Sequence, residues 1–250
     1  MIHTLRGVLC LISLVVALPA GAAGLTVSAA SSLTESFRDI AQAYERAYPG
    51  ADVDLNFAAS GVLLQQVARG APVDVLATAD TATVDQAAQQ GLLMAGTRQL
   101  FASNQLVVVV PRGARSVPAT LAALGTAGVQ RVAIGNPDSV PVGRYARTAL
   151  QDAGLWQAMA ARTITTQNVR QSLDYVARGE VDAAFVYSSD LKAADGKVRQ
   201  AFVVPLKAPI TYPLAVLKDT RHAAEARRFV AFVRSPQGQA ILRRHGFGAP

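Results

Sequence analysis

The residues best suited to chemistry lie in short segments that each join a predicted strand to the helix after it. Five of these segments contain small, hydroxyl-bearing or apolar residues: Ser31-Ser32, Ala59-Ser60-Gly61, Val140-Pro141-Val142-Gly143, Gln167-Asn168-Val169 and Tyr187-Ser188-Ser189. The first turn of a helix has unpaired N–H groups and the positive end of the helix dipole, and both attract anions. The five turns therefore predict an anion site built from N–H and O–H donors.

Each turn taken alone has a simpler interpretation, which is ordinary helix capping. Ser32 and Glu35, for example, have the spacing of a capping box. The collective interpretation is favoured because the carboxyl ends of parallel strands in an open α/β sheet converge on one crevice. Cations are scarce in the turns, with Arg144 after Gly143 as the exception. We therefore predict a small oxyanion held by neutral donors rather than a phosphate clamped by cations.

Catalytic motifs are absent from the sequence, which has no Walker loop, no G-x-G-x-x-G fingerprint and no G-x-S-x-G elbow. His222 and His245 are the only histidines after the N-terminal segment, and both are predicted to be solvated residues of basic helices. A serine hydrolase that uses Ser32 or Ser60 is the alternative from another functional class. It is disfavoured because neither histidine lies in a candidate turn.

Ser189 and Lys192 match the pattern S-x-x-K, but no S-D-N or K-T-G element accompanies them. We interpret this segment as the start of a helix, with Ser189 as the cap and Lys192 in solvent. The sequence therefore predicts a protein that is not an enzyme and that needs no cofactor.

Alternating strands and helices must position the turns. Strands are predicted at 25–28, 53–57, 73–77, 106–110, 131–134, 182–187, 202–204 and 214–217, and helices at 33–48, 83–90, 143–152, 223–233 and 237–244, with further amphipathic helices at 63–68 and 169–177. This alternation is typical of βαβ units and mostly parallel sheets. With no internal repeat and no long linker, the predicted fold class is α/β with two lobes in one continuous chain.

The N-terminal segment has the pattern of a secretory signal peptide, predicted to span residues 1–23. A cationic start that includes Arg6 precedes an apolar run from Val8 to Leu18 and then a run of small residues. The apolar run is too short for a permanent membrane anchor. Cys10, the only cysteine, lies within it, so the mature chain would have no disulfide or thiolate site. A soluble periplasmic protein is expected.

Composition excludes several other classes. Of the 250 residues, 51% are hydrophobic, a fraction too high for a disordered chain. The chain carries a net charge of +7. Loss of Arg6 with the signal peptide would leave 23 basic and 17 acidic residues, a net charge of +6. The basic residues are scattered and form no recognisable nucleic-acid module, so no nucleic-acid partner is predicted.

The ordered series of motifs resembles the periplasmic molybdate-binding proteins of ABC importers, a family of type II solute-binding proteins. The resemblance runs from Leu25 to Phe247 and rests on Ala30-Ser31-Ser32-Leu33-Thr34, Phe57-Ala58-Ala59-Ser60, Gly70-Ala71-Pro72-Val73-Asp74, Gly135-Asn136-Pro137, Val140-Pro141-Val142-Gly143, Asn168-Val169-Arg170 and Val186-Tyr187-Ser188-Ser189-Asp190. It implies a two-lobed periplasmic binding protein type II fold with the ligand in the interlobe cleft. Lobe I would comprise 24–103 plus 211–250, and lobe II 104–210.

The resemblance also implies the site residues. Ser32 and Ser60 would donate through their hydroxyls and backbone N–H groups from lobe I. From lobe II, Val142 and Val169 would donate backbone N–H groups, and Tyr187 its phenolic O–H. The ligand would be molybdate or tungstate, contacted through its oxygens, with no protein ligand to the metal. Gly61 departs from the pattern, because relatives often have a serine there.

The implied function is capture of molybdate by a monomer and delivery to an ABC permease, with closure at hinges near Ser103-Asn104 and 207–211. A site made only of donors suits a fully deprotonated dianion. The O–H of monohydrogen phosphate would lack an acceptor there, at a cost of about 1–3 kcal/mol. Sulfate would have to be rejected by size, because it too offers only acceptors. A binding protein for sulfate, thiosulfate or another small oxyanion is therefore the alternative.

Overall fold

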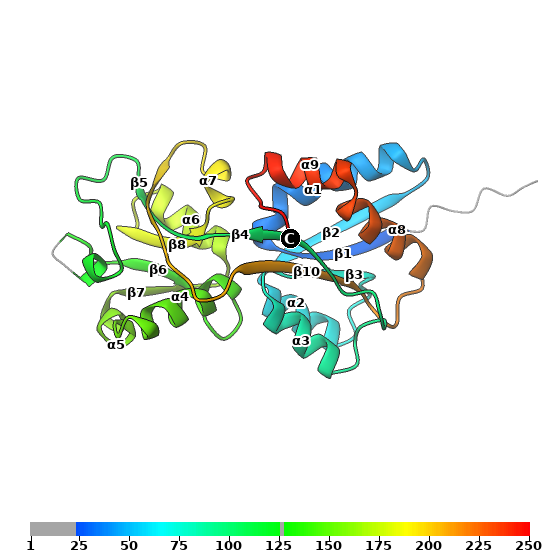
Figure 1. Ribbon diagram of the computed structural model, residues 1–250, viewed down its shortest axis with the longest axis horizontal. Helices are drawn as coiled ribbons and strands as arrows, with labels where there is room; N and C mark the ends of the chain where they lie inside the picture. The colour runs from blue at the N-terminus through cyan, green and yellow to red at the C-terminus, as the bar shows by residue number, and fades with distance from the viewer. Residues whose placement is uncertain (1–23, 126–127) are drawn as a thin grey trace, which may run out of the picture.

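The computed structural model describes residues 24–125 and 128–250, and two five-stranded sheets form the centres of two lobes (Figure 1). The predicted signal peptide, residues 1–23, lies outside the described residues. In the part of the chain that the structure describes, no helix combines the length and apolarity needed to cross a membrane.

Lobe I is built on a sheet with the strand order β2-β1-β3-β10-β4. Its strands are β1 (Gly24–Ala30), β2 (Asp52–Ala58), β3 (Val75–Ala77), β4 (Gln99–Asn104) and β10 (Ile210–Val216). Helices α1 (Thr34–Ala47), α8 (Ala223–Arg234) and α9 (Pro236–Arg244) lie over one face, and α2 (Ser60–Ala68) and α3 (Thr81–Gln89) over the other (Figure 1). A 3-10 turn, Ser31–Leu33, joins β1 to α1.

Lobe II has a second sheet with the order β7-β6-β8-β5-β9. Its strands are β5 (Leu106–Pro111), β6 (Val132–Gly135), β7 (Thr163–Thr166), β8 (Ala183–Tyr187) and β9 (Val198–Val203). The helices of this lobe are α4 (Pro141–Asp152), α5 (Trp156–Met159), α6 (Val169–Ala177) and α7 (Asp190–Ala193), with 3-10 turns at Ala122–Gly125 and Ala160–Arg162.

Both sheets are mixed, and in each of them four of the five strands run in one direction. The reversed strands are β10, which pairs antiparallel with β3 and β4, and β5, which pairs antiparallel with β8 and β9. The prediction of mostly parallel sheets is correct for strand direction, but it did not include these two reversals. Their cause is the chain path. Ile210 begins β10 opposite the end of β4, and Leu106 begins β5 opposite the end of β8, so both strands enter their sheets from the interlobe side.

The helices form where apolar residues recur at helical spacing. In α1, Phe37, Ile40 and Tyr44 are fully buried against the sheet, and the helix ends just before Pro49. Phe37 contacts the rings of Phe101 and Phe229 edge to face, at centroid distances of 5.7 and 6.3 Å. Packing of α1 against β4 and α8 therefore holds the helix in place, and with it the turn before α1 that contains Ser32.

Candidate anion-binding site

A small cavity lies between the lobes, where the carboxyl ends of strands from both sheets meet. Its lining residues are Ala30, Ser31, Ser32, Ala59, Ser60 and Ala79 from lobe I, and Val140, Pro141, Val142, Val169 and Tyr187 from lobe II. The five residues that the resemblance implied are all among them, and none of the eleven is charged. The cavity volume is about 10 Å³, roughly that of a water-sized sphere and far below the roughly 300–1,000 Å³ of sites for drug-sized organic ligands. The dimensions suit a small ion.

Ser60 has its hydroxyl proton available for the cavity. It is the first residue of α2, is fully buried, and its Oγ accepts the backbone N–H of Ala79 at 3.1 Å. Because that bond uses a lone pair and not the proton, the hydroxyl remains able to donate. The N–H groups of Gly61 and Val62 donate to the carbonyls of Ser139 and Ala59, so the N–H that α2 can present beside the Ser60 hydroxyl is that of Ser60 itself.

Ser32 does not cap helix α1, so the capping-box interpretation is wrong. The residue before α1 is Leu33, which makes no side-chain cap, and Glu35 pairs with Arg170 of lobe II instead of reaching back to the turn. The reason is that Ser32 lies inside the 3-10 turn Ser31–Leu33, so that Leu33 and not Ser32 occupies the capping position of α1. The Ser32 hydroxyl is buried and lies 3.2 Å from the hydroxyl of Tyr212.

From lobe II, two helix N-termini line the cavity. Val142 is the second residue of α4, which begins at Pro141 without a side-chain cap, and Val169 is the first residue of α6. N–H groups at these positions have no partner within their helices. A Cβ at Gly143 would lie 1.9 Å from the carbonyl oxygen of Gly135, so only glycine lets α4 begin this close to the end of β6.

Tyr187 contributes a buried hydroxyl at the end of β8. The residue is 1% exposed, and its hydroxyl has no hydrogen-bond partner among the described residues. Burial raises the pKa of Tyr187 well above its ordinary value of 10.0, so the hydroxyl keeps its proton and can donate. An unpaired buried polar group costs about 1–3 kcal/mol. An anion oxygen in the cavity would satisfy this hydroxyl.

The two arginines nearest the cavity pair across the lobes. Arg144 Nε donates to Asp80 Oδ2 at 2.8 Å, and Arg170 pairs with Glu35 and donates to the Ser31 carbonyl at 3.2 Å. Neither arginine lines the cavity. Only Arg144 was predicted as a cation near the turns, whereas Arg170, which directly follows Val169, lies near the cavity as well. Both cations therefore act as interlobe ties, and the donors in the cavity lining are uncharged.

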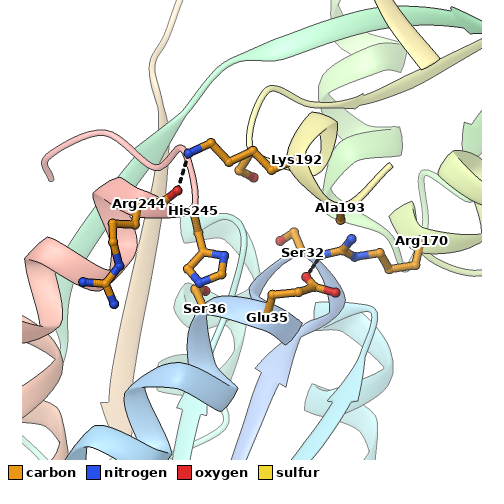
Figure 2. Close-up of a pocket in the computed structure, with 9 residues that line it drawn as sticks. Ser32, Glu35, Ser36, Arg170, Lys192, Ala193, Arg244 and His245 are labelled. Atoms are coloured by element: carbon orange, nitrogen blue, oxygen red, sulfur yellow. Dashed lines mark hydrogen bonds and ion pairs between the residues drawn. The ribbon is translucent and has the colours of Figure 1, made fainter. Parts of the chain in front are cut away.

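Figure 2 shows the groove next to Ser32, where Arg170 reaches Glu35. Lys192 is exposed, as predicted, and its Nζ also donates to the Arg244 carbonyl. One sequence prediction is corrected here. Ser189 makes no cap hydrogen bond with its side chain, and its Oγ instead accepts from Asn104 Nδ2 at 2.9 Å. Lys192 therefore bonds to Arg244 in the C-terminal helix α9, and Ser189 bonds to Asn104 at the crossing between the lobes.

The two histidines are also less solvated than predicted. His245 Nε2 lies 2.8 Å from Asp39 Oδ2, and His222 Nδ1 lies 3.4 Å from Asp74 Oδ2. Both pairs form because the C-terminal helices pack back on lobe I. Neither histidine lines the cavity. Within 24–125 and 128–250, no group of three or more histidine, cysteine or acidic side chains could hold a metal ion.

Asp190 is a fully buried carboxylate beside the cavity. Burial raises the pKa of Asp190 from 3.8 to about 6, although Arg170 and the Tyr187 N–H both favour the charged form. Asp190 Oδ2 accepts that N–H at 2.9 Å, and Arg170 Nε lies 3.8 Å from Oδ1. The carboxylate therefore helps to hold the backbone at Tyr187, at the expense of a buried charge above pH 6.

The protein is expected to become less stable as the pH rises from about 4 to about 6. In this window the unfolded chain has lost the Asp190 proton while the folded protein retains it, so folding becomes harder as pH increases. With about 1.4 kcal/mol per pKa unit, the loss is on the order of 3 kcal/mol and is complete above the folded pKa. Urea unfolding of the wild type and of Asp190→Asn between pH 4 and 8 measures it. The variant should lack this slope, whereas Asp174→Asn, at an exposed position on α6, should retain it. Parallel curves for the wild type and Asp190→Asn would contradict the assignment.

Known proteins resemble this chain over most of its length. Residues 25–248 match the family profile described as bacterial extracellular solute-binding protein. The molybdate-binding protein ModA of Escherichia coli (strain K12) is 34% identical over 230 residues, covering 89% of this chain and 88% of that protein. ModA of Mycobacterium tuberculosis (strain H37Rv) is 36% identical over 232 residues, covering 92% and 86%. The solved structure of the Azotobacter vinelandii periplasmic molybdate-binding protein superimposes with a TM-score of 0.82 at 25% identity, covering 90% of this chain and 99% of that one.

Proposed function

Because the chain belongs to the bacterial extracellular solute-binding proteins, we propose that it captures molybdate outside the cytoplasm and delivers it to a membrane ABC permease. The observation that carries this proposal is the interlobe cavity, which is small, lined by neutral donors and free of charged side chains. The sequence motifs predicted a resemblance to molybdate-binding proteins, and the similarity to two proteins of that name confirms it.

The proposed ligand contacts follow from the donors in the cavity. The Ser32, Ser60 and Tyr187 hydroxyls and the N–H groups at Val142 and Val169 would hold the oxygens of one tetrahedral dianion. Dipoles of this kind replace the lost water shell, so the anion needs no counter-ion in the cavity. Contact through the oxygens leaves no direct protein ligand on the metal. Tungstate has the same charge and shape, and we propose it as a second ligand. The proposed role is binding without catalysis and without a cofactor.

The interlobe ties support a closed arrangement that buries the anion. Arg144 with Asp80, Arg170 with Glu35, and a hydrogen bond from Gly61 N to the Ser139 carbonyl at 3.0 Å join the lobes around the cavity. We propose lobe boundaries at 24–103 plus 211–250 and at 104–210, with bending in the two crossings near residues 104 and 207–211. The permease would recognise the closed form of a monomer.

We propose a periplasmic location reached through the signal peptide 1–23. The support is the pattern of that segment in the sequence, together with the extracellular family to which the chain belongs. Mass spectrometry of the exported protein would identify the cleavage site, which we place near Ala22 or Ala23.

Calorimetric titration of residues 24–250 with molybdate, tungstate, sulfate and monohydrogen phosphate tests the function. We expect binding of molybdate and tungstate, much weaker binding of sulfate, and the weakest binding of phosphate. At a ligand concentration 100 times Kd, the bound protein should gain about 2.7 kcal/mol in unfolding free energy. Absence of both heat and thermal shift with molybdate and tungstate would refute the proposal. Tighter binding of sulfate than of molybdate would favour the alternative function, a binding protein for sulfate or another small oxyanion.

A further inference from the structure

A chain of buried polar groups leads from the interlobe crossing to Ser32. Tyr212, in β10, is fully buried, and its hydroxyl lies 3.2 Å from Ser32 Oγ. The same hydroxyl accepts a hydrogen bond from Asn104 Nδ2 at 3.3 Å. Asn104 ends β4, beside the start of β10, where the chain passes from lobe I to lobe II (Figure 1). We call these three residues the Asn104–Tyr212–Ser32 relay.

The orientation of the Asn104 amide is determined by its neighbours. The backbone N–H of Gln105 donates to Asn104 Oδ1 at 2.9 Å, and the Ser188 hydroxyl lies at the same distance. Because a backbone N–H can only donate, the amide atom facing Gln105 must be the oxygen. The amide nitrogen therefore faces Tyr212 and Ser189, and it approaches Tyr212 as a donor.

The hydroxyl proton of Tyr212 then has one available acceptor. The Asn104 amide nitrogen has no lone pair to offer, and Ser32 Oγ is the only other hydrogen-bond partner of this hydroxyl among the described residues. The tyrosine ring is enclosed by Phe101, Tyr187 and Phe247 in edge-to-face contacts. An unpaired O–H in these surroundings would cost about 1–3 kcal/mol, so the Tyr212 hydroxyl donates to Ser32.

We infer that Tyr212 and Asn104 are positioning residues that set the direction of the Ser32 hydroxyl, so that Ser32 donates its own proton into the cavity. This inference rests on the proposed function, in which an oxyanion receives that proton. Ser60 is in the same state, because the N–H of Ala79 occupies a lone pair of its oxygen. Both serines would therefore face the cavity as donors before any anion arrives.

The relay has a consequence for selectivity. A hydroxyl that is free to rotate can accept the O–H of a protonated anion as readily as it can donate to a deprotonated one. Ser32 held by Tyr212 has its proton already directed at the cavity, which favours anions with acceptors only. Tyr212 would therefore contribute to rejection of anions that carry an O–H, without contacting any anion itself.

The first test is Tyr212→Phe, which removes the hydroxyl and keeps the ring and its packing. Calorimetry at pH 8 compares molybdate with hydrogen arsenate, a tetrahedral dianion with one O–H, measured by displacement if its binding is weak. We expect molybdate affinity to fall about 3- to 10-fold, which corresponds to one net hydrogen bond, and arsenate affinity to fall less. Tyr44→Phe is the matched control, since Tyr44 is buried in lobe I with its hydroxyl on Glu225. It should change neither affinity. Equal losses for the two anions, or no loss, would overturn the relay.

The second test needs no anion. Neutron diffraction from the deuterated protein should place a deuteron on the Tyr212 oxygen, directed at Ser32 Oγ, and the Asn104 amide deuterons toward Tyr212 and Ser189. A deuteron on Ser32 directed at Tyr212 would overturn the relay even if molybdate binds. A wild-type protein that binds no oxyanion would instead refute the proposed function, so the two failures are distinct.

Discussion

Replacement of both Ser32 and Ser60 by alanine is expected to weaken molybdate binding by about 10²- to 10⁴-fold. Each substitution removes an O–H donor to a charged ligand in a buried site. Hydrogen bonds to charged groups contribute about 1.5–3 kcal/mol each, so two of them give about 3–6 kcal/mol. Calorimetric titration of the single and double variants measures the loss and shows whether the two serines act independently.

The control for the serine variants is Ser36→Ala. Ser36 is also buried, but its hydroxyl donates to the Leu33 carbonyl and it does not line the cavity. This variant should bind molybdate as the wild type does.

Ser60→Ala should also lower the free energy of unfolding by about 1–3 kcal/mol, because the Ala79 N–H loses its acceptor. Wild-type affinity in the double variant would remove these serines from the site.

Replacement of Gly61 by alanine is expected to hinder closure of the lobes and to weaken molybdate binding about 5- to 150-fold. A Cβ at Gly61 would lie 2.6 Å from the carbonyl oxygen of Ser139 and 2.9 Å from its Cα, so the backbone of lobe II would have to move. Displacements of this kind cost about 1–3 kcal/mol. The Gly61 backbone is helical, so alanine suits α2 itself and the effect falls on the interlobe contact.

Two measurements separate closure from folding for Gly61→Ala. Small-angle scattering with saturating molybdate should show a larger radius of gyration than the wild type with molybdate, while urea unfolding without ligand should show no loss of stability. Gly113→Ala is the matched control, because a Cβ there would contact nothing within 4 Å. If Gly61→Ala binds molybdate as the wild type does, this contact is not needed for closure.

Strands with continuous apolar runs were predictable, and among the four edge strands β2 and β9 were predicted at least in part, whereas β4 and β7 were not. The run from Leu106 to Val110 is fully buried and forms β5 as predicted. Strands β4 and β7 were missed, and both lie at the edge of a sheet, where residues such as Leu100 and Ile164 are exposed. An edge strand needs no buried run on both faces, so hydropathy alone does not mark it.

In the candidate site, too, some residues were predictable from the sequence and others were not. The resemblance named the five residues that the fold brings around one cavity, and their role as ligand donors remains a prediction. Local reasoning was wrong where a tertiary partner displaced a local one, as when Glu35 pairs with Arg170 instead of closing a capping box. Tyr212 was missed because it lies 180 residues from Ser32 in the chain, and nothing around it in the sequence marks a polar role.

The sequence by itself determined the α/β class, the turns that contain the donors, and the scarcity of cations among them. These features depend on residue type and on spacing within about ten residues. Only the tertiary structure decided which strands reverse, where the arginines find their partners, and which way the buried hydroxyls point. Those outcomes depend on groups that meet across the two lobes after the chain has crossed between them twice. A hydroxyl has no direction of its own, and its direction is set by the neighbours that folding places around it.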